Sequence, residues 1–263
     1  MTKTLSRRFV LQSLVAGVAA AGHTLSFSSA SRSMPVSKAE GAFIIHNDLP
    51  WALETRRSQF GFGPITSASQ LFVRNNLPAP PASLTDQGDD WSFDVVGCAR
   101  EGSLTLADLK RMKSRTVATV LQCSGNGRDF FPHDPSGSQW GVGAAGCVLW
   151  TGVSVADILE QFGGVQSGLA YLTATGGEEL PEGVDKDAVV VERSVPIEKG
   201  LKDCLLVWEM NGAPLPVIHG GPVRLVVPGY FGVNNVKWVR QLAATAGESG
   251  AKIQQSGYRM RPE

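Results

Sequence analysis

The amino-acid sequence predicts an α+β fold built on a mixed β-sheet. Short apolar runs rich in β-branched residues predict strands at residues 93–96, 117–121, 170–173, 205–208, 223–227 and 236–239. Only residues 105–112 and 154–163 have a helical pattern. Each of these two segments begins with a hydroxyl residue followed three positions later by an aspartate, which is typical of a helix start. Strands and helices do not alternate regularly, so a doubly wound parallel sheet is not expected.

The chain divides into four parts in this interpretation. They are an export signal at residues 1–30, an irregular leading segment at 31–66, the main domain at 67–245 and a C-terminal tail at 246–263. Three prolines between residues 78 and 81 mark a stiff extended stretch at the start of the main domain, because proline fixes φ and disfavours helix before it. Asn211-Gly212, which follows a predicted strand, indicates a tight turn.

The N-terminus has the pattern of an export signal. Residues 6–11, Ser-Arg-Arg-Phe-Val-Leu, are similar to the twin-arginine motif, and a short apolar run leads to small residues at Ser28 and Ala30. This run is too short and too rich in alanine and glycine for a membrane anchor, so cleavage is expected near Ala30. The twin-arginine route carries folded proteins, often with a cofactor inserted. The resemblance therefore implies a bacterial periplasmic protein that is exported folded.

Composition favours a catalytic domain over a nucleic-acid-binding one. The 263 residues are 43% hydrophobic, which is enough to bury a full core. The chain has 24 basic and 24 acidic side chains. The segment that cleavage would remove contains lysine and arginine but no aspartate or glutamate, so the remaining chain has a small excess of acidic side chains. A slightly acidic body argues against nucleic acid as a partner. No later apolar stretch is long enough to span a bilayer, so no membrane span is expected in the mature protein.

Cys123 is the most informative residue in the sequence. It follows a predicted strand and opens the glycine-rich loop that ends at Arg128. A guanidinium and turn amides favour the thiolate, which makes this cysteine a metal ligand or a nucleophile. The other cysteines, Cys98, Cys147 and Cys204, have no Cys-x-x-Cys spacing and are expected to be buried thiols or to form one disulfide. Because Cys-x-x-Cys-His does not occur, no haem is expected in this chain.

Three further clusters carry groups that bind anions. They are Arg74-Asn75-Asn76, the segment from His219 to Arg224, and Asn234-Asn235-Val236-Lys237. A phosphate attached to a polar heterocycle needs this mixture of charged donors, amides and glycine backbone N–H groups. Each cluster alone also has an ordinary explanation, as a solvated surface charge, a hydrogen-bonded core histidine or a turn.

Together the clusters resemble the molybdopterin-binding domain of the sulfite oxidase and sulfite dehydrogenase family. Four motifs occur in order, namely Arg-Asn-x-Leu-Pro at 74–78, Leu-Gln-Cys-x-Gly-Asn-x-Arg at 121–128, His-Gly-x-Pro-Val-Arg-x-x-Val-Pro-Gly at 219–229 and Val-Lys-Trp at 236–238. The likeness spans residues 70–243, and four ordered motifs argue against a chance match. The resemblance implies the family's mixed-sheet fold, with molybdenum and molybdopterin as cofactors.

The resemblance also implies a role for individual residues. Cys123 would bind molybdenum through its thiolate, and soft sulfur suits a metal that cycles between oxidation states. Arg128 would hold an oxyanion substrate near the metal, and Arg74 would be the third catalytic residue. The implied cofactor-binding residues are Arg74, Asn75, Asn76, Cys123, Asp185, His219, Arg224, Asn235 and Lys237.

The implied reaction is the transfer of an oxygen atom, with sulfite oxidised to sulfate. Positive side chains near the metal would attract the anion and stabilise charge as oxygen moves. The electrons would leave one at a time to a separate acceptor, such as a periplasmic c-type cytochrome. Members of this family commonly continue into an immunoglobulin-like dimerisation domain, which is not expected in a chain that ends at Glu263.

Two positions depart from the family pattern. Asn76 occupies the position of a family histidine, and Val191 occupies the position of an expected active-site tyrosine. Tyr171 and Tyr230 are candidates to replace that tyrosine. Another small sulfur compound, or an S-oxide that is reduced, is therefore an alternative substrate.

Two other classes of protein are also consistent with parts of the sequence. In a thiol hydrolase, His133 or His219 would assist Cys123, and the amides of Gly125 and Gly127 would form an oxyanion hole. That mechanism leaves the remote arginine and lysine clusters unexplained. A non-catalytic anion-binding module would explain the basic loops but does not require the thiol.

Overall fold

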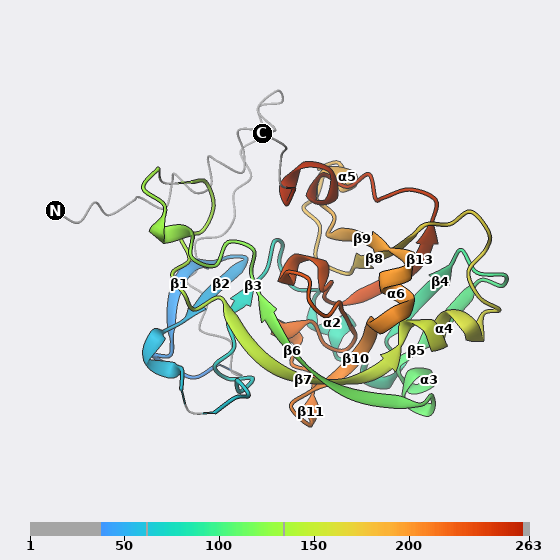
Figure 1. The fold of residues 1–263 in the computed structure, drawn as a ribbon, viewed down its shortest axis with the longest axis horizontal. Helices are drawn as coiled ribbons and strands as arrows, with labels where there is room; N and C mark the ends of the chain where they lie inside the picture. Colours follow the sequence, from blue (N-terminus) through green and yellow to red (C-terminus); the bar gives the residue numbers. More distant parts are fainter. Residues whose placement is uncertain (1–37, 62, 134, 260–263) are drawn as a thin grey trace. The chain divides into compact units, whose positions relative to one another are not determined.

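In the computed structural model, which describes residues 38–61, 63–133 and 135–259, the strands form three sheets (Figure 1). The first sheet is antiparallel, in the order β1 (Phe43–Asp48), β2 (Trp51–Thr55) and β3 (Val73–Arg74). The second has the order β11 (Ala213–Pro214), β10 (Leu205–Met210), β7 (Ala145–Ser154) and β6 (Ser114–Gln122), and β12 (Arg224–Val226) also pairs with β10.

The third sheet makes the fold mixed. Its order is β5 (Gly102–Thr105), β4 (Ser92–Val96), β13 (Val239–Thr245), β8 (Tyr171–Gly176) and β9 (Glu192–Pro196). The pair β4 and β13 is parallel, whereas the other pairs of this sheet are antiparallel. The predicted α+β class with a mixed sheet is confirmed.

The helices in the described part of the chain are short. The α-helices are α2 (Ala82–Thr85), α3 (Leu106–Arg111), α4 (Val155–Gln161), α5 (Lys186–Val189) and α6 (Ile197–Asp203). The 3₁₀ turns are η1 (Arg57–Gln59), η2 (Gly88–Asp90), η3 (Arg128–Phe130), η4 (Val217–His219) and η5 (Gly232–Asn234), and η6 (Ile253–Gly257) is a π-helix. None of the helices that the structure describes is long and apolar enough to cross a membrane.

Both predicted helices are present, and α3 starts as its sequence pattern indicates. The Asp108 amide donates to Thr105 Oγ1 at 3.1 Å, and the Thr105 amide donates to Asp108 Oδ2 at 2.7 Å, which completes a capping box. α4 follows Ser154, but the Ser154 side chain makes no capping hydrogen bond. The predicted turn at Asn211-Gly212 is confirmed, with φ values of 55° and 76° between β10 and β11.

The predicted strand at residues 236–239 was wrong for most of its length. β13 begins at Val239, because Trp238 has a φ of 50°, which no extended strand contains. The other five predicted strands coincide with β4, β6, β8, β10 and β12. β7 was not predicted because glycines interrupt its apolar pattern. One of them, Gly152, is required by close packing, since a Cβ there would lie 2.0 Å from the Leu206 carbonyl oxygen of β10.

The leading segment at residues 31–66 is not irregular where the structure describes it. Residues 43–55 form the hairpin β1–β2. The alternation of apolar and polar residues that would predict these strands is hard to see in the sequence, because two of the inward-facing residues are polar. These two residues, His46 and Glu54, face each other at 2.7 Å, so the polar groups satisfy one another. The predicted tail is likewise packed up to residue 259, with buried Ser249, Ala251 and Gln254.

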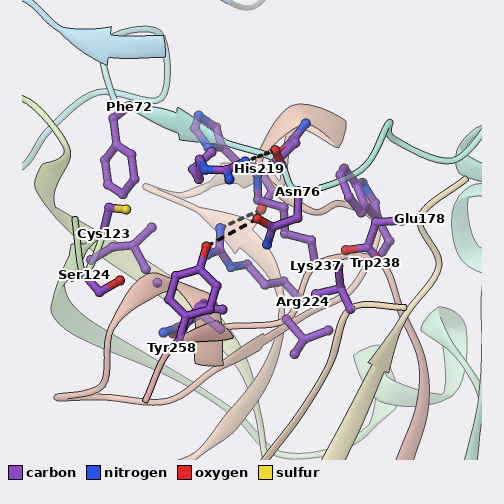
Figure 2. Close-up of a pocket in the computed structure, with 18 residues that line it drawn as sticks. Phe72, Asn76, Cys123, Ser124, Glu178, His219, Arg224, Lys237, Trp238 and Tyr258 are labelled. Atoms are coloured by element: carbon purple, nitrogen blue, oxygen red, sulfur yellow. Dashed lines mark hydrogen bonds between the residues drawn. The ribbon is translucent and has the colours of Figure 1, made fainter. Parts of the chain in front are cut away.

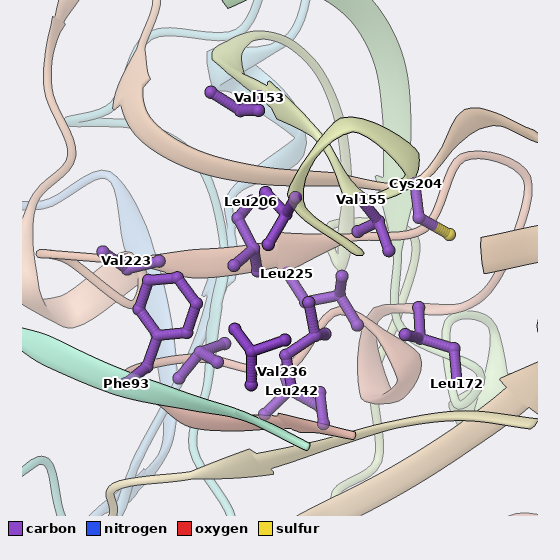
Figure 3. Close-up of a cluster of buried hydrophobic side chains, with 14 of the residues drawn as sticks. Phe93, Val153, Val155, Leu172, Cys204, Leu206, Val223, Leu225, Val236 and Leu242 are labelled. Carbon is purple, nitrogen blue, oxygen red and sulfur yellow. The ribbon is translucent and has the colours of Figure 1, made fainter. Parts of the chain in front are cut away.

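The main hydrophobic core lies between the third sheet and strands β10 and β12 (Figure 3). Phe93, Leu172 and Leu242 from the sheet meet Leu206 and Leu225 from the two strands. This core holds the starts of β12 and β13 rigidly on one side of the site described below.

The cysteines are free thiols. Cys98 and Cys204 are buried, which is one of the two alternatives that the sequence left open. Burial raises the pKa of Cys204 to about 12, so this thiol stays protonated and unreactive. Cys123 is also buried, at the end of β6, in a second core cluster beside Leu121 and Trp140.

Candidate cofactor and active site

One cavity brings together eight of the ten predicted site residues (Figure 2). It encloses about 640 Å³ of empty space, part of it open to solvent. The predicted residues that line it are Arg74, Asn75, Asn76, Cys123, His219, Arg224, Asn235 and Lys237. They come from β3 and the loop after it, from the end of β6, and from the loops around β12 and before β13. The fold therefore brings residues that are far apart in the sequence together around one cavity.

Cys123 is held at one side of the cavity by backbone hydrogen bonds. Its amide donates to the Ala144 carbonyl at 2.9 Å, and the Ala144 amide donates to Asn126 Oδ1 at 2.9 Å. Gly127 takes a φ of 88°, and its amide reaches the Gly141 carbonyl at 2.7 Å. The loop after β6 is thus locked to residues 141–144, and the thiol has a fixed place, 8% exposed.

A buried carboxylate fixes residues 141–144 in turn. Glu54 Oε2 accepts from the Gly141 amide and Glu54 Oε1 accepts from the Gly143 amide, both at 3.0 Å. His46 Nε2 lies 2.7 Å from the same Oε2, and the His46 ring packs against Trp140. The β1–β2 hairpin therefore supports the Cys123 loop. The sequence interpretation missed this role because the hairpin itself was not predicted.

The other side of the cavity is strongly cationic. Lys237 Nζ donates to Asn75 Oδ1 at 2.6 Å and to the Ile218 carbonyl at 2.8 Å. Arg224 Nη1 donates to the His219 carbonyl at 2.8 Å. Burial lowers the pKa of Arg224 to about 9, and burial and the neighbouring cations hold the pKa of Lys237 and of His219 well below their usual values. An anion in the cavity would offset the repulsion between these groups and favour their charged forms.

Lys38 adds a further charge behind His219. Its ammonium donates to the carbonyls of Ala68 and Leu71, at 2.7 and 2.6 Å, and lies 2.7 Å from His219 Nε2. Burial lowers the pKa of Lys38 to about 7. Nε2 faces Lys38 and the Ala68 carbonyl, and the lowered pKa of His219 makes it a weak base, which weighs against the thiol hydrolase. His133, the other candidate base, lines a neighbouring depression and not this cavity.

Two polar atoms at the cavity lack partners among the described residues, and they indicate what it binds. They are Arg224 Nε, a donor, and Glu178 Oε2. Burial raises the pKa of Glu178 to about 8, so its carboxyl group carries a proton at neutral pH and can donate a hydrogen bond. Unpaired buried donors and uncompensated cations are stabilised by an anion with further hydrogen-bonding atoms. The residues present therefore fit a phosphate-bearing heterocycle such as molybdopterin.

Two predicted site residues lie outside this cavity. Arg128 lines the neighbouring depression, and its Nη1 donates to the Ser138 carbonyl at 3.0 Å. Ser124, the residue after Cys123, lines both spaces, so the depression that holds Arg128 adjoins the Cys123 side of the cavity. Asp185 lies on the loop before α5, and Glu178 is the acid that lines the cavity instead. The Gly-Gly-Glu sequence at residues 176–178, where β8 ends, was the signal that could have found Glu178.

Asn235 lines the cavity but uses its amide elsewhere. Its Oδ1 accepts from the Val227 amide at 2.9 Å, and its Nδ2 donates to the Phe231 carbonyl at 3.0 Å. It therefore braces its own loop. Val191 also lines the cavity, whereas Tyr171 and Tyr230, the suggested replacements for the family tyrosine, do not.

Comparison with known proteins decides the family. The family model described as "Oxidoreductase molybdopterin binding domain" matches residues 79–253. The chain belongs to this family. It is 33% identical to the mitochondrial sulfite oxidase of Homo sapiens over 204 residues, which is 74% of this chain and 36% of that protein. It is 30% identical to the sulfite oxidase of Arabidopsis thaliana over 227 residues, 81% of this chain and 56% of that protein.

The fold is also similar to that of a solved structure. The structure is similar to the sulfane dehydrogenase SoxCD from Paracoccus pantotrophus, with a TM-score of 0.67 and 23% sequence identity, over 92% of this chain and 61% of that one. The chain spans only about a third of the length of the animal sulfite oxidases that it matches. Family membership and the mixed-sheet molybdopterin fold predicted from the four motifs are confirmed, and molybdenum with molybdopterin is the cofactor that this domain implies.

The first prediction concerns the carboxylate that supports the Cys123 loop. A Glu54→Gln variant keeps one acceptor oxygen but places an NH₂ group against a backbone amide. We expect the variant to lose about 1.5–3 kcal/mol of unfolding free energy and its Cys123 to be alkylated faster in cofactor-free protein. An exposed helical acid, Glu160→Gln, is the matched control. Equal alkylation rates in both variants would show that Glu54 does not position the loop.

The second prediction concerns Glu178 and pH. Its pKa is raised from 4.5 to about 8, so between these pH values the folded protein keeps a proton that the unfolded chain has lost. The contribution of this group to the unfolding free energy is full below pH 4.5 and falls as pH rises to about 8.

Denaturant unfolding of cofactor-free protein at several pH values checks this expectation. The stability of the wild type relative to Glu178→Gln should decline steadily from pH 5 to pH 8, whereas an exposed neighbour, Glu179→Gln, should show no decline. A constant difference between the wild type and Glu178→Gln would contradict the assignment of a protonated buried carboxyl.

Proposed function

We propose that this chain is the molybdenum-carrying part of an oxidoreductase that transfers an oxygen atom, with sulfite oxidised to sulfate. The observation that carries the proposal is the cavity itself. One thiol, Cys123, lies at one side, and the cations Arg224 and Lys237 lie at the other (Figure 2); Arg74 also lines the cavity. A soft metal ligand and an anion-binding wall in one space are what a molybdenum cofactor with a phosphate tail requires.

The residues that would hold the cofactor follow from their contacts. Arg224 and Lys237 would bind the phosphate, since both are enclosed cations and Arg224 Nε lacks a partner in the described structure. His219, Arg74 and Asn75 would contact the pterin beside them. Cys123 would bind the metal, and bound molybdenum would supply the two-electron oxygen-transfer chemistry. A bound anion would also favour the charged form of Lys237, whose pKa is lowered by burial and by the neighbouring cations.

Several observations support sulfite as the substrate. The relatives at 30–33% identity include several sulfite oxidases, and also a nitrate reductase of Neurospora crassa at 31%, and the chain covers only part of each. A cationic cavity draws in an anion and stabilises charge during oxygen transfer. Arg128, in the depression that shares Ser124 with the cavity, would attract the anion. Asn76 and Val191 at the cavity keep an S-oxide as the second candidate, because neither can provide the titratable group of the family pattern.

The proposal includes export and a separate electron acceptor. The twin-arginine pattern at residues 6–11, which lies outside the described residues, supports folded export to the periplasm. A c-type cytochrome there would take the electrons one at a time. The absence of Cys-x-x-Cys-His from the sequence supports an acceptor on another chain.

The third prediction tests this function. Protein purified with its cofactor should contain near-stoichiometric molybdenum and should oxidise sulfite with a c-type cytochrome or a dye as acceptor. We expect Cys123→Ser to lose turnover at least a hundredfold, whereas Cys147→Ser, outside the cavity, should retain it. The same assay with sulfoxides and a reduced dye separates the second candidate. Molybdenum-loaded protein that turns over neither class would contradict the proposal.

A further inference from the structure

The C-terminal segment, residues 246–259, leads back to the cavity and is hydrogen-bonded to β9. The Ser249 amide donates to Ser194 Oγ at 2.8 Å, and the Ser194 amide donates to Gln254 Oε1 at 3.2 Å. The buried Arg193 guanidinium donates to Asn234 Oδ1 at 3.0 and 3.2 Å and also to the Ile253 carbonyl. Hydrogen bonds from consecutive residues of one strand give this segment a fixed path. η6 then ends beside the cavity.

Tyr258, directly after η6, is the residue of this segment that reaches the cavity. Its side chain lines the same cavity as Cys123, and its hydroxyl points towards Asn76 (Figure 2). The hydroxyl donates to Asn76 Oδ1 at 3.4 Å, which is long for an O–H···O bond. A proton held this loosely can turn to a stronger acceptor at little cost. An amide can present either its oxygen or its NH₂ group, so Asn76 can still support the phenol when the proton has turned away.

Asn75 and Asn76 are adjacent in sequence but have different hydrogen-bond partners at the cavity. Asn75 accepts from Lys237, on the cationic side assigned to the cofactor. Asn76 is turned to Tyr258 instead. Val191, which also lines the cavity, has no polar atom in its side chain, and among the residues that line it the hydroxyl groups are those of Ser124 and Tyr258. Tyr258 is therefore a neutral hydroxyl donor in a cavity whose buried cations donate to carbonyls, to an amide oxygen or to the implied phosphate.

We propose that Tyr258 is a substrate-contacting residue, whose hydroxyl, supported by Asn76, donates a hydrogen bond to an oxygen atom of the sulfur oxyanion in the cavity. The proposal rests on the proposed function for the class of substrate. It assigns to the C-terminal segment, beyond the residues that carry the family motifs, a part in completing the active site. No covalent change at Tyr258 is involved, because its part is to hold and orient the anion.

The fourth prediction compares Tyr258→Phe with Tyr171→Phe, both as molybdenum-loaded enzymes. Phenylalanine keeps the ring packing and removes only the hydroxyl, and Tyr171 does not line the cavity. A hydrogen bond to a charged group is worth enough that its loss should lower kcat/KM for sulfite about tenfold or more. The dissociation constant of sulfate, measured by calorimetry with the oxidised protein, should rise by a similar factor. The control variant should change neither quantity, and molybdenum content should stay equal in both.

The outcomes separate this inference from the proposed function. Wild-type enzyme that binds sulfate more tightly than Tyr258→Phe but does not oxidise sulfite would support the contact and contradict the function. Normal sulfite turnover in Tyr258→Phe, or unchanged sulfate binding, would overturn the contact. Loss of molybdenum from Tyr258→Phe would also overturn it, because the residue would then hold the cofactor. Asn76→Ala should weaken sulfate binding, and the double variant should bind no more weakly than Tyr258→Phe alone.

Discussion

Enclosed positive charge is the constraint on which this structure depends. Lys38, Arg74, Arg224 and Lys237 gather near one cavity, and Glu178, the acid that lines it, keeps its proton. Removing such charges from water is unfavourable unless an anion offsets it. Burial lowers the pKa of Arg224 and, together with the neighbouring cations, that of Lys237. The cavity is thus suited to an anionic group, and family membership identifies that group as the molybdenum cofactor.

The fold supplies each wall of the cavity from a different layer. The first sheet contributes Arg74 through β3 and supports the Cys123 loop through Glu54. The second sheet ends β6 at the thiol and carries Arg224 on β12. The third sheet places Lys237 just before β13 and anchors the segment that carries Tyr258 through β9. No single element forms the site, so its geometry depends on the packing of all three sheets.

The sequence predicted most of the chemistry of the site but less of its support. Cys123, Arg224 and Lys237 were identifiable because motifs with several fixed residues can be recognised locally. Glu54, Lys38 and Tyr258 could not be found in this way, since each acts through one tertiary contact between residues far apart in the chain. Asp185 was predicted from the sequence and Glu178 was not considered. Both acids follow β8, and the structure shows that Glu178 is the one that lines the cavity.

The central claim is that Cys123 binds molybdenum in a cavity built for its cofactor. X-ray absorption at the molybdenum edge tests this most directly, because it counts the sulfur atoms bound to the metal. The account predicts one fewer sulfur neighbour in cofactor-loaded Cys123→Ser than in the wild type, and no change in Cys147→Ser. An identical sulfur count in wild type and Cys123→Ser would contradict it.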